Sequence, residues 1–170
     1  MKKTMVYLAA GALLLFAVAA VLLFTPAGKG PLERLFAVGD LAPFDFAKPD
    51  LPDEPNRFLL CPPDFCGATP QAESPAFAVP VETLGEAWRD LAAAQPRVTL
   101  LAESEDGLRL DYVQRSARFR FPDIITVRFI ALSPAESTLA VYSRSLYGRS
   151  DFGVNRERIE SWLELLRARL

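Results

Sequence analysis

Histidine is absent from the 170-residue chain, and all four lysines lie before residue 49. Residues 49–170 therefore offer neither an imidazole nor an amine side chain. This excludes histidine-dependent triads, Ser-Lys pairs and Schiff-base lysines from that part of the chain. Without histidine, a zinc site built on the two cysteines would need two carboxylates to complete it. Such a site is unfavourable, because zinc prefers nitrogen and sulfur ligands. We expect no metal and no cofactor, so any acid–base chemistry has to use carboxylates, tyrosine or cysteine.

An excess of positive charge is also missing. The chain has 19 basic and 21 acidic residues, which gives a net charge of −2. A duplex-binding surface needs a strong positive excess. Only residues 111–158 lean that way, with eight arginines against five acids. We therefore expect no nucleic-acid partner.

One long apolar run lies near the N-terminus. Residues 5–24 carry no charge, and as a helix they span about the ~30 Å hydrocarbon core of a bilayer. The prediction is a transmembrane anchor over residues 1–24. A cleaved signal peptide is the alternative, although Thr25-Pro26-Ala27 fits its small-x-small site poorly. Lys2 and Lys3 precede the run, so the positive-inside rule predicts a single-pass protein of the bacterial inner membrane with a cytoplasmic N-terminus and a periplasmic or otherwise extracytoplasmic C-terminal domain.

The segment after the apolar run is rich in proline. Residues 25–56 hold six prolines and an acidic excess, a composition that disfavours both helix and sheet. We interpret the segment as a semi-extended stalk that acts as a spacer. The alternative is that Phe36, Phe44 and Phe46 dock onto the domain or the bilayer surface.

Residues 57–170 show the periodicity of a folded α+β domain. A capping-box pattern at Thr83, followed by an apolar stripe, predicts a helix over residues 84–94. The Asp106-Gly107 pair predicts a tight turn between two strands. The predicted strands cover residues 97–104, 108–115, 124–132 and 137–145, with an additional edge strand at 76–81.

The last segment predicts an amphipathic helix. Asn155 is placed to cap it, and Val154 to staple onto Ile159. Its apolar face needs a buried partner, and the predicted sheet is the one available. The expected fold class is α+β: a twisted antiparallel sheet of four to five strands with two helices on one face, plus an N-terminal transmembrane helix.

Cys61 and Cys66 are separated by four residues. On the outward side of a membrane such a pair favours a structural disulfide. Free thiols and a redox dithiol are the alternatives. The spacing is not the two-residue spacing of oxidoreductase motifs, and no βαβ pattern follows.

Three arginines fall on one predicted face of the sheet. By alternation, Arg109, Asp111 and Arg115 share one face of their strand, as do Arg128 with Thr126 and Arg144 with Tyr142. If these faces coincide, three arginines line the sheet surface opposite the helices. A solvated polar face is the ordinary explanation for such a pattern in an antiparallel sheet. The alternative is a clamp for an anion, because guanidinium groups bind carboxylate and phosphate bidentately.

The loop that leads into the last helix carries further polar residues. Gly148 and Gly153 account for its turns, but Arg156 and Arg158 lie in the first helical turn, where the helix dipole disfavours a cation. A bound anion would relieve this conflict, as would Asp151 or Glu157. The candidate binding residues are Arg115, Arg128, Arg144, Ser145, Tyr147, Arg149, Ser150, Asp151, Asn155 and Arg156.

The same loop carries a resemblance to a known family. Its motif residues are Arg144-Ser145, Gly148, Ser150-Asp151, Gly153-Val154-Asn155-Arg156 and Arg158-Ile159, together with Phe119-Arg120-Phe121-Pro122-Asp123 and Pro55-Asn56. Over about residues 55–165 the chain resembles the family known as domain of unknown function 1499. Family members that resemble this chain include bacterial proteins with an N-terminal membrane segment. The resemblance implies no established activity, cofactor or catalytic residue.

Two classes of function remain open from the sequence. The first is a non-enzymatic, membrane-anchored module of the cell envelope that binds an anionic or amphiphilic ligand, or an envelope protein, at the arginine-rich segment. The second is a hydrolase- or transferase-like enzyme, with Asp151 or Asp123 as base and Tyr147 or Ser145 assisting.

Overall fold

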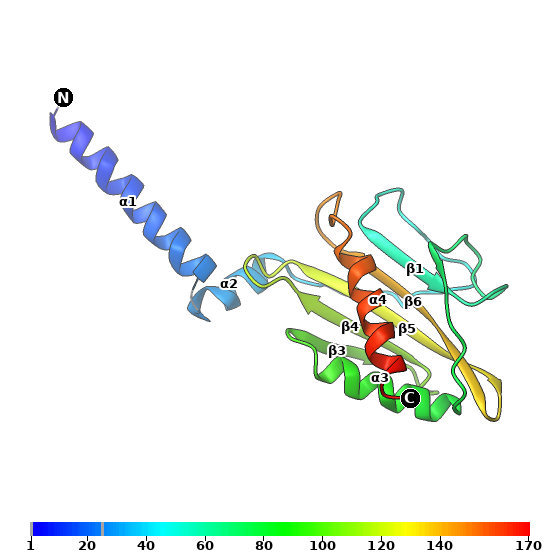
Figure 1. Cartoon of the computed structure of the whole chain (residues 1–170). Coiled ribbons are helices and arrows are strands. Elements are labelled where there is room, and N and C mark those ends of the chain that lie inside the picture. The colour runs from blue at the N-terminus through cyan, green and yellow to red at the C-terminus, as the bar shows by residue number, and fades with distance from the viewer. Residues whose placement is uncertain (1, 25) are drawn as a thin grey trace.

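The computed structural model describes residues 2–24 and 26–170. Two helices, α1 (Lys2–Phe24) and α2 (Pro26–Leu35), precede the folded domain (Figure 1). Helix α1 is apolar around its whole circumference, and its stretch Lys3–Val21 is long and apolar enough to cross a membrane, with none of it buried inside the protein. The helix predicted from residues 5–24 is therefore present.

Helix α2 corrects the expectation of an extended chain directly after the anchor. Its first residue is Pro26, and Pro31 lies inside it. Proline is well tolerated at the first helical position, because its missing N–H is not needed there. The proline count therefore overestimated how far the chain would remain extended.

The domain is built on one six-stranded sheet with the order β2-β1-β6-β5-β4-β3. Only the β1–β2 pair is parallel, so the sheet is mixed, and it has six strands where four to five were expected. The strands are β1 (Arg57–Cys61), β2 (Ala72–Glu73), β3 (Val98–Glu103), β4 (Arg109–Arg115), β5 (Pro122–Ser133) and β6 (Glu136–Ser145).

Four of these strands were predicted, and their antiparallel pairing is confirmed. The turn between β3 and β4 contains Gly107 at φ 67°, as the Asp-Gly pair predicts. The edge strand expected at residues 76–81 is wrong. Phe77 makes only an isolated bridge to Ser137, and Val81 already belongs to the next helix.

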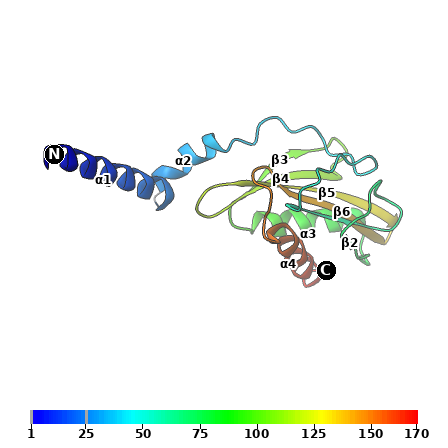
Figure 2. The ribbon, with the colours of Figure 1, turned by 90° about the horizontal axis from the view of Figure 1, so that it is seen from above.

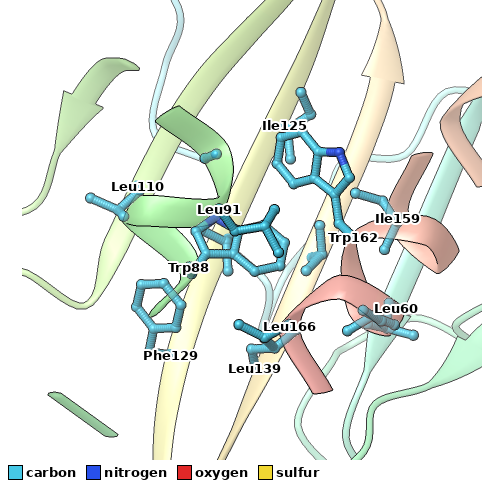
Figure 3. Packing of buried hydrophobic residues seen from close by; sticks show 14 of the residues in the cluster. Leu60, Trp88, Leu91, Leu110, Ile125, Phe129, Leu139, Ile159, Trp162 and Leu166 are labelled. Carbon is cyan, nitrogen blue, oxygen red and sulfur yellow. The ribbon is translucent and has the colours of Figure 1, made fainter. Parts of the chain in front are cut away.

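Helices α3 (Val81–Ala93) and α4 (Val154–Arg167) cover the same face of the sheet (Figures 1 and 2). The rings of Trp88 and Trp162 meet edge to face at 5.4 Å between the two helices. Phe129 of β5 lies beside Trp88, and Ile159 and Leu166 fill the sheet side of α4 (Figure 3). Burying each of these side chains stabilises the fold by about 1.5–3 kcal/mol. This cluster fixes both helices to the sheet.

The starts of both helices differ from the prediction. Helix α3 begins at Val81, after Pro80, and no side chain caps it, so the capping box at Thr83 is wrong. Helix α4 begins at Val154, after Gly153 at φ 87°. Asn155 therefore lies inside the helix and not at its cap. Val154 is half-exposed and does not act as a staple.

The other face of the sheet is covered by a segment that we call the strap, residues 40–52. Figure 2 shows this segment crossing the sheet on the side opposite α3 and α4. Phe44 stacks on Tyr142 of β6 at 4.3 Å, and Phe46 is buried in a second core cluster. For these two aromatics the docked arrangement, and not a free spacer, is what the structure contains.

The disulfide loop holds the strap in place. Cys61 and Cys66 are bonded, as predicted, and the backbone N–H of Gly67 donates to the carbonyl of Phe46 at 2.9 Å. A Cβ on Gly67 would lie 2.0 Å from the carbonyl oxygen of Ala47. Only glycine allows the two segments to approach this closely.

Candidate functional site

Asn155, one of the predicted binding residues, lies at the centre of a buried polar network. Its side chain is fully buried, and its Oδ1 accepts hydrogen bonds from the Ser143 hydroxyl at 2.6 Å and from Arg158 Nη1 at 2.6 Å. Its Nδ2 faces Asp151 Oδ2 at 2.7 Å and the Asn56 carbonyl at 3.1 Å. These contacts tie β6, the following loop and α4 together. The amide is therefore occupied by the protein's own groups.

Arg158, which was not among the candidate binding residues, also belongs to this network. Its Nη2 contacts Asp123 Oδ2 at 2.5 Å, its Nη1 donates to Ser143 at 2.9 Å, and its Nε donates to Gln114. The Arg158 side chain is 7% exposed. Asp123 of β5 therefore neutralises Arg158 in the first turn of α4. The sequence had suggested a bound anion, Asp151 or Glu157 for this role.

Asp151 satisfies the start of α4. Its carboxylate accepts the backbone N–H groups of Gly153 at 3.1 Å and Asn155 at 2.9 Å. Partial burial raises the pKa of Asp151, but these hydrogen bonds and that from the Asn155 amide outweigh burial, and the pKa is lowered. Ser150 accepts the N–H of Phe152 at 3.3 Å. The loop motif therefore builds a helix start rather than an open cavity.

The other predicted binding residues of this region lie apart from one another. Arg115 donates to the carbonyls of Phe36 and Arg120 at 3.0 and 2.9 Å. Arg156 pairs with Glu160 at 3.3 Å and lies over the Phe58 ring. Ser145 accepts a hydrogen bond from Asn155, and Tyr147 donates one to the carbonyl of Ala37. Arg144 lies over the Tyr142 ring, and Arg149 is exposed in the loop.

One hollow lies under the strap, on the arginine face of the sheet. We call it the strap pocket. Its volume is about 300 Å³. It is lined by Pro43, Phe44, Asp45, Phe46, Ala47, Phe65, Arg109 and Arg128. Of the predicted residues, Arg128 therefore belongs to it.

Arg109 and Arg128 are direct neighbours across β4 and β5. Two like charges at opposed positions repel each other unless anions lie nearby. Arg128 pairs with Asp106 at 2.8 Å, and Arg109 Nε lies 3.4 Å from Asp111, without the geometry of a hydrogen bond. Within the described residues, the terminal nitrogens of Arg109 make no hydrogen bond. These donors are therefore available to a bound group.

The acid beside Arg128 is held ionised. Hydrogen bonds from the Ser104 hydroxyl and the Leu108 N–H, together with Arg128, lower the pKa of Asp106 to about 2. One of the two guanidinium groups is therefore neutralised near neutral pH, and the other is only loosely paired. The strap pocket holds two guanidinium groups on its strand side and the carboxylate of Asp45 on its strap side.

A second hollow of about 360 Å³ continues along the strap beside β6, with Phe44 shared between the two. Tyr142 and Arg144 line it. The Tyr142 hydroxyl is buried without a hydrogen-bond partner among residues 2–24 and 26–170. Burial raises the pKa of this hydroxyl, so it stays protonated and keeps a donor. This places Arg144, another predicted residue, next to the strap pocket.

Arg109 and the strap aromatics are the site residues that the sequence did not assign. Alternation already placed Arg109 on the same face as Arg115. The register that brings it opposite Arg128 depends on the exact pairing of β4 with β5. The sequence signal was the group of Phe44 and Phe46 within a proline-rich segment, which is unusual for a plain spacer.

Fold and site together define a small α+β domain that follows a helix long and apolar enough to cross a membrane. The sequence model of the family described as protein of unknown function DUF1499 matches residues 49–166. This match covers more than half of the 170 residues, and the chain belongs to that family. No curated protein matches the sequence.

Proposed function

We propose that the protein is a single-pass, membrane-anchored module of the bacterial cell envelope that binds an anionic, amphiphilic ligand in the strap pocket without transforming it chemically. The observation that carries the proposal is the meeting of two guanidinium groups with three phenyl rings in one hollow. Arg109 and Arg128 supply the positive charge, and Phe44, Phe46 and Phe65 supply the apolar wall.

This combination suits a small molecule with a carboxylate, sulfonate or phosphate at one end and an apolar body. Guanidinium groups bind such anions with paired hydrogen bonds. Small-molecule sites are mostly apolar, with a few polar groups that set the orientation of the ligand. At about 300 Å³ the strap pocket lies at the lower end of ligand-site volumes, which favours a small ligand or the head of a larger one.

The proposed location has separate support. The bond between Cys61 and Cys66 is of a kind that persists outside the cytoplasm. Lys2 and Lys3 precede the apolar run, which favours a cytoplasmic N-terminus. Both features agree with a periplasmic or otherwise extracytoplasmic domain.

The geometry gives less support to the enzyme alternative. Asp151 holds the start of α4 with a lowered pKa, and Asp123 is paired with Arg158. Tyr147 donates to a backbone carbonyl, and Ser145 accepts from Asn155. A general base needs a free carboxylate close to the proton that it removes, and these acids are already engaged.

The test uses the full chain in lipid nanodiscs and a probe with the proposed chemistry. Phenylbutyrate carries a ring and a carboxylate, and phenylbutyramide is its neutral counterpart. Thermal unfolding is followed by the fluorescence of Trp88 and Trp162. At ten times its dissociation constant, phenylbutyrate is expected to stabilise the protein by about 1.4 kcal/mol, whereas the amide is expected to have little effect.

A double variant tests whether this effect comes from the strap pocket. Arg109→Gln combined with Arg128→Gln is expected to abolish the stabilisation. Arg167→Gln, which removes the same kind of charge from the exposed end of α4, is expected to retain it. Equal stabilisation by the acid and the amide, or stabilisation that survives in the double variant, contradicts the proposal.

A further inference from the structure

Four aromatic rings form a continuous string at one end of the domain. Phe119 and Phe121 of the β4–β5 loop stack at 5.6 Å, and Phe121 meets Phe36 edge to face at 4.5 Å. Phe36 in turn meets Tyr147 of the β6–α4 loop at 5.3 Å. The string therefore joins two loops, far apart in the sequence, to the chain that follows α2.

These rings are exposed to an unusual degree. The exposed fractions are 48% for Phe119, 38% for Phe121 and 40% for Tyr147. Phe152, two residues before α4, is 93% exposed. A single exposed apolar residue needs no explanation, but a contiguous aromatic patch usually marks an interaction surface.

The patch lies next to the membrane helix. Arg120 binds Glu33 of α2 through Nε at 2.8 Å and Nη2 at 2.5 Å, and Tyr147 donates to the carbonyl of Ala37 at 2.8 Å. Helix α2 has ten residues, which corresponds to about 15 Å of rise. These contacts hold the aromatic string within roughly 20 Å of the end of α1. Figure 1 shows the β4–β5 loop beside α2.

The charge around the patch is positive. Arg118 and Arg149 are exposed in the two loops, and neither has an ion pair within the described part of the chain. The acids nearby are already engaged, because Glu33 binds Arg120 and Asp151 holds the start of α4. Exposed aromatics with unpaired arginines are the composition found where proteins meet the head groups of anionic lipids.

We propose that the β4–β5 and β6–α4 loops, residues 116–121 and 146–153, rest on the surface of the same bilayer that α1 crosses. Phe119 and Phe152 enter the interfacial region, and Arg118 and Arg149 face anionic head groups. The domain is thereby held in one orientation, with the far β5–β6 hairpin pointing away from the membrane. This inference rests on the membrane anchoring by α1 in the proposed function, and it does not depend on a ligand in the strap pocket.

The test compares two tryptophan variants of the full chain in vesicles that contain about 30% anionic lipid. Phe119→Trp places a reporter at the proposed contact. Leu132→Trp is the matched control, because Leu132 is an exposed apolar residue close to the β5–β6 turn. The native Trp88 and Trp162 are buried in the core of both variants. Far-UV circular dichroism confirms that each variant is folded.

Lipids brominated along the acyl chain quench only a tryptophan that reaches them. The added emission of the Phe119→Trp variant is expected to fall about twofold on changing to brominated lipid, and that of the Leu132→Trp variant to stay unchanged. Equal quenching of the two variants, or none in either, overturns the proposal. In the Phe119→Trp background, Arg118→Gln with Arg149→Gln is expected to weaken the quenching, and unchanged quenching contradicts the role given to the arginines.

Discussion

Replacing Asn155 by alanine is expected to lower the free energy of unfolding by about 4 kcal/mol. The truncation removes the hydrogen-bond partner of two charged groups, Arg158 and Asp151, and of three neutral groups, Ser143, Ser145 and the Asn56 carbonyl. Buried hydrogen bonds contribute about 1.5–3 kcal/mol each to charged groups and about 0.5–1.5 kcal/mol each to neutral ones. The expected loss lies near the lower end of the sum, because Arg158 keeps Asp123 and Asp151 keeps two backbone N–H groups.

The assay is thermal or urea unfolding of the full chain, followed by the fluorescence of Trp88 and Trp162, which are buried in the core between α3 and α4. A loss of this size corresponds to a fall in melting temperature on the order of 10 °C. Val154→Ala, at the half-exposed neighbouring position, is the control and is expected to change stability by less than about 0.5 kcal/mol. A loss below about 1 kcal/mol for Asn155→Ala refutes the reasoning, because the network then does not hold the loop.

Three further predictions concern the strap, the disulfide and the pH dependence. Gly67→Ala is expected to displace the strap, because its Cβ would lie 2.0 Å from the carbonyl oxygen of Ala47; faster backbone hydrogen exchange across the strap is the readout, and unchanged exchange speaks against the packing described. Reducing the bond between Cys61 and Cys66 is expected to cost about 2 kcal/mol of stability in the chain-entropy account, measured by unfolding with and without reductant, and no difference contradicts it. The lowered pKa of Asp151 contributes stability above the pKa of an aspartate in the unfolded chain, near 3.9, and that contribution is lost as the pH falls toward the lower folded-state pKa. The wild type is therefore expected to lose more stability than Asp151→Asn between about pH 5 and 3. Equal losses in urea unfolding at the two pH values contradict the assignment.

The sequence predicted those elements whose signals are local. Strands β3 and β4 follow from their β-rich composition and from Asp106-Gly107, and the buried stripe of α4 follows from its period. Strand β1 has no alternation because four of its five residues are buried, so periodicity does not distinguish it from other apolar runs. An asparagine just before an apolar stripe looks the same in the sequence whether it caps the helix or, like Asn155, lies at the centre of a buried network. Its burial against β6 decides between the two roles, and burial is a property of the whole fold.

The site was less accessible from the sequence than the fold. The arginine face was predicted, but the neighbouring position of Arg109 and Arg128 depends on strand register, which one residue of slip would reverse. Docking of the strap was only the alternative to a spacer, because its contacts with β6 and the disulfide loop join segments far apart in the sequence. A proline-rich composition indicates what a segment does not form by itself. It does not indicate what other parts of the chain hold it against.

The most direct test of ligand binding in the strap pocket is native mass spectrometry of the full chain, released from nanodiscs prepared from the membranes in which it was produced. We predict a bound small anion on the wild type and on Arg167→Gln, and its loss from the variant that combines Arg109→Gln with Arg128→Gln. A wild type without a bound molecule, or a molecule retained by the double variant, would contradict the account.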